Sequence, residues 1–236
     1  MKRTLHILCA GAVQGLVKAV QARFMAEHQA EIDGRFGAVG AMKDALMSGV
    51  PCDVLIVTET MLHALRGNGA IDADASAAVG RVRTGVAVRE GEAIPAVDST
   101  EALKAAFVAA PAIYLPDTVK STAGAHVAAV IERLGLRDTV TPKLAIFANG
   151  ATAMTALANR GELGAIGCTQ VTEIVYTPFL TLAGRLPDPF DLATTYSAGV
   201  SKTASDFTLA TSFIALLCGP ETASLRRDGG FESIDS

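Results

Sequence analysis

The sequence contains no tryptophan, and aromatic residues make up only 5% of its 236 positions. It also has no apolar run approaching the roughly 20 residues that a membrane-spanning helix needs, so we expect no membrane partner. Half of the residues are nevertheless hydrophobic and 19% are charged, which is typical of a folded globular chain rather than a disordered one. A chain of this length can bury one large core or the cores of two smaller lobes.

Clusters of lysine or arginine are absent as well, and the formal net charge is −4. Nucleic-acid binding requires a basic stripe that neutralises phosphates, so we expect no nucleic-acid partner. The four cysteines are widely scattered, with no close pair and no paired histidine, so the sequence predicts no metal site and no cofactor. Each cysteine lies in or beside an apolar run, which favours buried reduced thiols.

The N-terminal segment begins with two basic residues and an apolar stretch, which superficially resembles a secretory leader. The apolar run is short, however, and residues 5–8 followed by Gly11 are more typical of a first strand and its turn. Too little chain precedes that strand for a cleavable leader. We therefore expect the protein to be cytoplasmic.

Strand and helix patterns alternate along the chain, which predicts an α/β fold with parallel sheets covered by helices. Strands are expected at residues 4–10, 31–36, 53–58, 81–88, 112–115, 144–147, 164–167 and 194–200, and helices at 13–28, 41–48, 59–66, 99–109, 123–134, 151–159 and 205–217. A proline-rich connection is expected at 178–189. Because ligands of such sheets lie beyond the carboxyl ends of the strands, the site is expected in the loops at 9–13, 37–40, 117–124, 148–152 and 168–170.

Several segments, taken in their order along the chain, resemble a known family. They are residues 9–13 (CAGAV), 36–40 (FGAVG), 49–56 (GVPCDVLI), 117–124 (DTVKSTAG), 133–136 (RLGL), 140–144 (VTPKL), 164–167 (GAIG) and 218–223 (CGPETA). Their order and spacing are similar to those of molybdate-binding proteins, which have the type II periplasmic-binding-protein fold. The resemblance covers nearly the whole chain and extends to the aconitate-isomerase-like members of this group.

The resemblance implies two α/β lobes with mixed sheets flanked by helices, joined by two crossover strands, with the ligand in a cleft between the lobes. One lobe is expected at residues 1–84 plus 190–236 and the other at residues 85–189. The crossings are expected near residues 85–88 and 174–177.

The sequence departs from the family at the positions that hold the oxyanion. The family's serines match Ala12 and either Ala38 or Val39, and its tyrosine matches Gly167. Each lost hydroxyl donor costs about 1–3 kcal/mol at a dry site, so molybdate is not expected. Backbone N–H groups that follow Gly11, Gly40 and Gly150 still suit an anion, and a larger carboxylate is the natural candidate.

The function expected from this resemblance is an isomerase or tautomerase that moves a proton, with an allylic double-bond shift, on a small unsaturated di- or tricarboxylate. The alternative is a non-catalytic solute-binding protein of the ABC-transporter type that binds a carboxylate or oxyanion. The expected partner is a small carboxylate anion, and a homodimer is a second possible assembly.

The candidate site residues come from the loops named above. The ligand-binding candidates are Gly11, Ala12, Val13, Val39, Gly40, Ser121, Thr122, Asn149, Gly150, Thr152, Thr169 and Gln170, and the catalytic candidates are Cys9, Cys168 and Ser121. Two alternatives stay open: both cysteines can be core residues, and Ser121 and Asn149 can be helix caps. Glu173 is expected to mark the crossover, since a carboxylate in an anion site is unfavourable unless it acts as a base.

Overall fold

The computed structural model describes residues 3–160 and 162–234. The chain divides into two compact units, Met1–Val82 with Thr194–Ser236 (unit 1) and Arg83–Ala193 (unit 2). The sequence had placed these boundaries at 84/85 and 189/190. No helix in the described ranges is long and apolar enough to cross a membrane.

Unit 1 contains a mixed sheet with the strand order β2-β1-β3-β9-β4, in which β4 contributes its first part. The strands are β1 (Arg3–Ala10), β2 (Ala30–Gly37), β3 (Val54–Thr58), β9 (Ala193–Ser201) and β4 (Ile71–Arg89). β1 is parallel to β2 and β3, and β9 is antiparallel to β3. The second half of β1 and nearly all of β3 are buried, because their apolar runs face helices on both sides.

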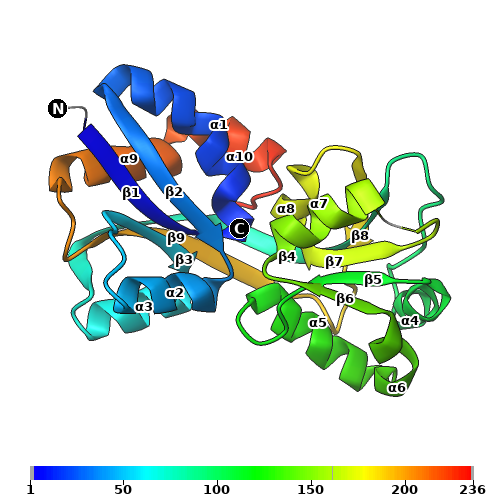
Figure 1. The fold of residues 1–236 in the computed structure, drawn as a ribbon. Coiled ribbons are helices and arrows are strands. Elements are labelled where there is room, and N and C mark those ends of the chain that lie inside the picture. Colours follow the sequence, from blue (N-terminus) through cyan, green and yellow to red (C-terminus); the bar gives the residue numbers. More distant parts are fainter. Residues whose placement is uncertain (1–2, 161, 235–236) are drawn as a thin grey trace. The chain divides into compact units, whose positions relative to one another are not determined.

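Helices cover both faces of this sheet. They are α1 (Gly11–His28), α2 (Val39–Met47), α3 (Glu59–Gly67), α9 (Phe207–Cys218), the 3₁₀ turn η2 (Pro220–Thr222) and α10 (Ala223–Asp228). Figure 1 shows α1, α9 and α10 on one face and α2 and α3 on the other. Phe24 of α1 meets Phe213 of α9 edge to face, with ring centroids 5.0 Å apart, which fixes the packing of these two helices.

Unit 2 has its own sheet, in which the second part of β4 is followed by β7, β5 and β6, and β8 also pairs with β4. Its strands are β5 (Ile113–Pro116), β6 (Leu144–Phe147), β7 (Ile166–Gln170) and β8 (Leu180–Arg185). Its helices are α4 (Thr100–Ala109), α5 (Thr122–Arg133), α6 (Arg137–Val140), η1 (Thr141–Lys143), α7 (Gly150–Arg160) and α8 (Val171–Val175). One apolar core lies under α4 and α5, and a second lies under α7 and α8.

Three expectations for secondary structure were wrong or incomplete. The crossing expected at 174–177 falls on α8 and the turn after it, and the chain instead enters unit 1 at the start of β9. The connection expected at 178–189 contains the strand β8. β7 begins only at Ile166, because Gly164 adopts a positive φ of 82° and turns the chain first, so residues 168–170 are strand rather than loop.

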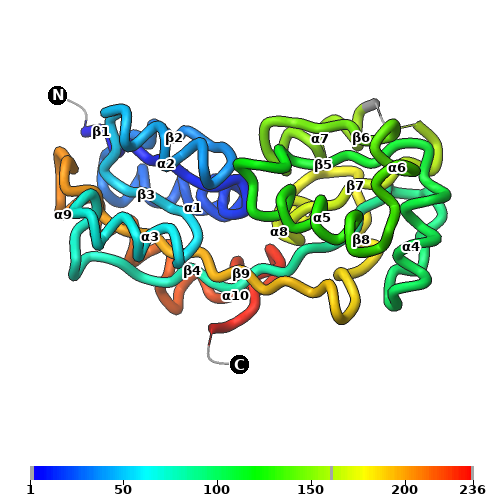
Figure 2. The backbone as a smooth tube through the Cα atoms, turned by 90° about the horizontal axis from the view of Figure 1, so that it is seen from below, coloured from blue at the N-terminus to red at the C-terminus, as the bar shows by residue number. Residues whose placement is uncertain are grey.

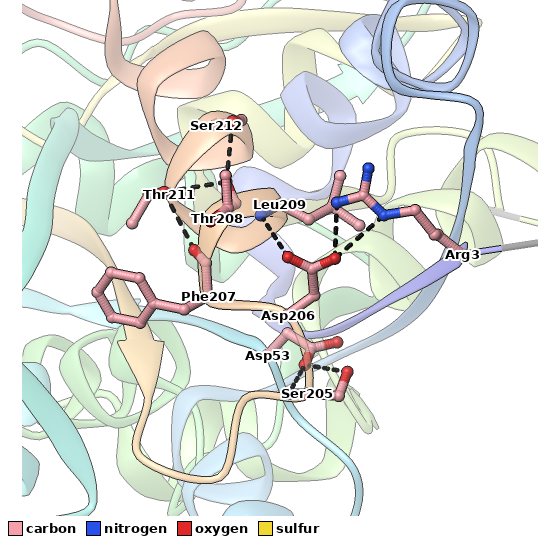
Figure 3. Close-up of polar contacts among 9 residues, drawn as sticks. All are labelled: Arg3, Asp53, Ser205, Asp206, Phe207, Thr208, Leu209, Thr211 and Ser212. Atoms are coloured by element: carbon pink, nitrogen blue, oxygen red, sulfur yellow. Dashed lines mark hydrogen bonds and ion pairs between the residues drawn. The ribbon is translucent and has the colours of Figure 1, made fainter.

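A buried carboxylate fastens the segment before α9 to the central strands (Figure 3). Asp53 is 2% exposed, and its Oδ2 accepts a hydrogen bond of 2.7 Å from the backbone N–H of His6. Its Oδ1 accepts hydrogen bonds from the backbone N–H and the hydroxyl of Ser205, at 2.6 and 2.9 Å. The next residue, Asp206, caps α9 by accepting from the N–H of Leu209 at 2.9 Å. The helix therefore begins at Phe207, two residues later than its apolar pattern predicts.

Replacing Asp53 with alanine is expected to lower the free energy of unfolding by about 2 kcal/mol, since it leaves the partly buried N–H of His6 without its acceptor. Urea denaturation of the variant and the wild type measures this difference. Asp33→Ala is the matched control, because Asp33 also meets His6 but is 65% exposed. Equal losses in the two variants would contradict the role given to Asp53.

Candidate functional site

Two helices of unit 1 begin side by side at the carboxyl ends of neighbouring parallel strands. β1 leads directly into α1, and β2 leads into α2 after the single residue Ala38. The last residues of the two strands, Ala10 and Gly37, are partners in the β-ladder. This edge of a parallel sheet is where such folds bind ligands.

The N-termini of α1 and α2 share a second property, the lack of a side-chain cap. Their N-cap residues are Ala10 and Ala38, which have no oxygen in the side chain, and neither helix start has a side-chain capping hydrogen bond. In contrast, α3, α4, α5 and α9 are capped by Thr58, Ser99, Ser121 and Asp206. Uncapped first-turn N–H groups and the positive end of the helix dipole favour an anion.

Five of the predicted ligand residues lie at these two helix starts. The structure brings together Gly11, Ala12 and Val13 on α1 with Val39 and Gly40 on α2. None of the five side chains carries a donor, so only their backbone N–H groups can bind a ligand.

The structure gives no support to the catalytic role predicted for the two cysteines. Cys9 is fully buried in unit 1, and its Sγ donates to the carbonyl oxygen of Ala10 at 3.2 Å. Cys168 is fully buried in the core of unit 2 beside Val86 and Phe107. Burial raises the pKa of both thiols, so both are protonated at neutral pH. A neutral thiol in an apolar core is a packing residue rather than a proton acceptor.

The N-terminus of α7 in unit 2 is capped by side chains of the protein itself. The backbone N–H of Thr152 donates to Oδ1 of Asn149 at 2.9 Å, and the N–H of Asn149 donates to Oγ1 of Thr152 at 3.2 Å. This reciprocal pair is a capping box, so the structure favours the capping interpretation of Asn149 and pairs the predicted ligand residue Thr152 with it.

The buried side chain of Glu173 accepts hydrogen bonds from the first N–H groups of α7. Glu173 accepts a hydrogen bond of 2.5 Å from the hydroxyl of Thr169, and the N–H groups of Gly150, Ala151 and Gln170 also donate to it. Burial raises the pKa of Glu173 from 4.5 to about 7, although these hydrogen bonds oppose the shift. Gly150 and Thr169 therefore do meet a carboxyl group, but this group belongs to Glu173.

The N-terminus of α5 in unit 2 and the loop before it are also held by hydrogen bonds from side chains of the protein. Oδ1 of Asp117 accepts hydrogen bonds of 2.7 Å from the N–H groups of Val119 and Lys120, and these bonds hold the pKa of Asp117 below its usual value. Ser121, a predicted catalytic residue, caps α5 through the N–H of Gly124 at 3.4 Å. Thr122 is the first residue of this helix. These contacts favour the capping interpretation of Ser121.

Sequence reasoning missed two polar residues of unit 2. Glu173 was assigned only to a crossover, although its position four residues after Thr169 is a usable signal. Thr84 was not singled out at all. It is fully buried opposite Gln170 in the β4–β7 ladder, and its hydroxyl has no hydrogen-bond partner within the described residues. The predicted residue Gln170 is 2% exposed at the end of β7.

No group of three or more histidine, cysteine, aspartate or glutamate side chains in residues 3–160 and 162–234 could hold a metal ion. The geometry therefore offers backbone donors for an anion in unit 1 and a buried acid of near-neutral pKa in unit 2.

Comparison with known proteins places this geometry in a family. The chain is similar to an aconitate isomerase from Pseudomonas sp, with 22% identity over 239 residues, which cover 98% of this chain and 88% of the relative. It shares the fold of the periplasmic molybdate-binding protein of Azotobacter vinelandii, with a TM-score of 0.78, 15% identity, and coverage of 97% of this chain and 98% of that one. It also shares the fold of the sulfate-binding protein SubI of Mycobacterium tuberculosis, with a TM-score of 0.75, 16% identity, and coverage of 99% and 88%.

These likenesses confirm the predicted resemblance to molybdate-binding proteins and the type II periplasmic-binding-protein fold. The family described as bacterial extracellular solute-binding protein matches residues 5–232. Because this match spans nearly the whole sequence, the chain belongs to the bacterial extracellular solute-binding protein family.

Proposed function

We propose that this protein binds a small carboxylate anion at the starts of α1 and α2. The observation that carries the proposal is the pair of adjacent helix N-termini capped by Ala10 and Ala38, neither of which has a side-chain oxygen. Most other long helices of the chain are capped by their own side chains, whereas these two leave their first N–H groups for a ligand.

A carboxylate suits these donors better than molybdate or sulfate does. A tetrahedral oxyanion presents four oxygens and gains from hydroxyl donors in addition to N–H groups, yet Ala12, Ala38 and Val39 supply none. A carboxylate presents two oxygens in one plane, which two adjacent helix starts can satisfy with N–H groups alone. The likeness to an enzyme that is named for aconitate, a tricarboxylate, supports the same ligand class.

Val39→Pro tests the proposed binding site, because it removes one N–H donor and leaves the helix in place. Val39 is the first residue of α2, where proline is well tolerated. The preceding Ala38 has φ −63° and ψ 148°, which is compatible with a following proline. Losing a hydrogen bond to a charged group costs about 1.5–3 kcal/mol, so calorimetry with trans-aconitate and citrate should show binding weaker by roughly tenfold or more.

Thr100→Pro is the matched control, since Thr100 is the first residue of α4 and also follows an extended N-cap. It should leave carboxylate binding unchanged. The proposal fails if Val39→Pro folds and binds as tightly as the wild type, or if molybdate or sulfate binds more tightly than every carboxylate of the panel.

A second function, isomerisation of a small unsaturated carboxylate, is favoured by Glu173. In this reaction a base removes a proton from a carbon next to a double bond, the double bond shifts by one position, and a proton returns to the far carbon. A base or acid with a pKa near 7 is well matched to both transfers, and that of Glu173 is about 7. The likeness to aconitate isomerase points to the same reaction class.

Proton NMR of cis- and trans-aconitate in deuterated water tests this second function. We expect enzyme-dependent deuterium incorporation that Glu173→Gln abolishes, while carboxylate binding in unit 1 persists. Binding without exchange in the wild type would assign the non-catalytic alternative, a solute-binding protein of the ABC-transporter type. A cytoplasmic location stays a prediction.

A further inference from the structure

Unit 1 contains a half-open pocket of about 550 Å³ between α3, β4 and β9. One face of α3 forms one wall, Ser76, Ala77 and Ala78 of β4 form another, and Ser197 of β9 also lines the pocket. α3 lies beside the first part of β4 in both views of the chain (Figures 1 and 2). The volume falls within the range of about 300–1,000 Å³ that is usual for small-molecule sites.

Three charged or titratable side chains follow one stripe of α3 along the pocket. Glu59, His63 and Arg66 are spaced by four and three residues, which places them on the same helix face. Glu59 and His63 form neither an ion pair nor a hydrogen bond through their side chains within the described residues. Arg66 donates to the carbonyl oxygen of Ala73, which holds its guanidinium beside the start of β4.

The interior of the pocket combines apolar surface with a buried hydroxyl. Leu62 is 3% exposed and Ser197 is 4% exposed, yet both line the pocket. A hydroxyl that lines a cavity can donate a hydrogen bond to a ligand or accept one from it.

We propose that this pocket binds a short zwitterionic peptide, with its ammonium group at Glu59 and its carboxylate at Arg66. The two residues are seven positions apart, which corresponds to about 10.5 Å along a helix axis. Three extended residues span roughly 10–11 Å, so a tripeptide matches this separation. The small side chains of Ala77 and Ala78 leave room for side chains of similar size.

The charges separate this ligand class from the one proposed for α1 and α2. A di- or tricarboxylate would meet the unpaired carboxylate of Glu59, which disfavours it. A zwitterion instead presents one charge of each sign, as the pocket does. The two proposals can therefore fail independently, because each uses its own probe.

Calorimetry of the full chain with trialanine tests the proposal. We expect Glu59→Gln and Arg66→Gln each to weaken trialanine binding about tenfold, which corresponds to about 1.4 kcal/mol. N-acetyl-trialanine should bind weakly and be insensitive to Glu59→Gln, and trialanine amide should be insensitive to Arg66→Gln. Glu101→Gln and Arg227→Gln are the matched controls, since Glu101 also lies in the first turn of a helix and Arg227 is an exposed arginine of unit 1.

Three results would overturn the proposal. One is the absence of trialanine binding at millimolar concentration in a sample whose circular dichroism shows a folded protein. Another is alanine binding as tightly as trialanine, which contradicts the length match. The third is equal effects of the pocket variants and the control variants.

Discussion

Replacing Gly150 with alanine is expected to lower the free energy of unfolding by about 4 kcal/mol. A Cβ atom at this position would lie 1.9 Å from Oε2 of Glu173 and 2.2 Å from Oγ1 of Thr169. Neither atom can simply move, because the carboxylate is held by the Thr169 hydroxyl, by the backbone N–H of Gln170 and by two backbone N–H groups at the start of α7. Overpacking costs about 1–3 kcal/mol, and the loss of hydrogen bonds to this buried carboxyl group adds about 1–3 kcal/mol.

Thermal unfolding measures this loss, which should lower Tm by roughly 8–16 °C for a chain of this size. Gly67→Ala is the matched control, because a Cβ at Gly67 meets nothing within 4 Å and the residue ends a helix. Gly67→Ala should leave Tm unchanged or raise it slightly, since alanine has the higher helix propensity. Combining Gly150→Ala with Glu173→Ala should cost less than the sum of the two single variants. Strict additivity would show that the clash with Glu173 is not the cause.

The fold could be predicted because its signals are local. Residues 7–10 and 54–57 are buried apolar runs followed almost at once by helical patterns, and such alternation is sufficient to indicate a parallel α/β sheet. The first part of β4 gave no such signal, since residues 71–78 are mostly alanine and aspartate. Its strand conformation comes from pairing with β9, which is more than a hundred residues away in the sequence.

The candidate site could be predicted only in part, for a similar reason. The starts of α1 and α2 follow from the position of each strand end, so the sequence could place Gly11, Ala12 and Val39 near these helix starts. Whether a donor is free depends on tertiary contacts. The carboxyl group of Glu173 accepts hydrogen bonds from the N–H groups of Gly150 and Ala151, and Oδ1 of Asn149 accepts one from the N–H of Thr152. These N–H groups are therefore not available to a ligand, even though the sequence at the start of α7 resembles a ligand loop. The homodimer and the cytoplasmic location stay predictions.

Glu173 should also make stability depend on pH between about 4.5 and 7. Burial raises its pKa in the folded chain to about 7 from an ordinary value of 4.5. In this window the folded state holds a proton that the unfolded state has released, so the free energy of unfolding falls as pH rises. The stabilisation is fully present below pH 4.5, is lost as pH approaches 7, and amounts to roughly 3 kcal/mol at 1.36 kcal/mol per pKa unit.

Glu173→Gln isolates this contribution, because glutamine has nearly the same shape and does not titrate. The difference in unfolding free energy between wild type and variant should shift by roughly 3 kcal/mol in favour of the variant as pH rises from 4.5 to 7.5. Asp72, Asp117 and Asp206 do not interfere, since their pKa values are lowered and their titration lies below this window. Urea denaturation at five pH values measures the difference. A difference that stays constant with pH would show that Glu173 does not titrate in this window, and its pKa would then not be matched to the two proton transfers of the proposed isomerase reaction.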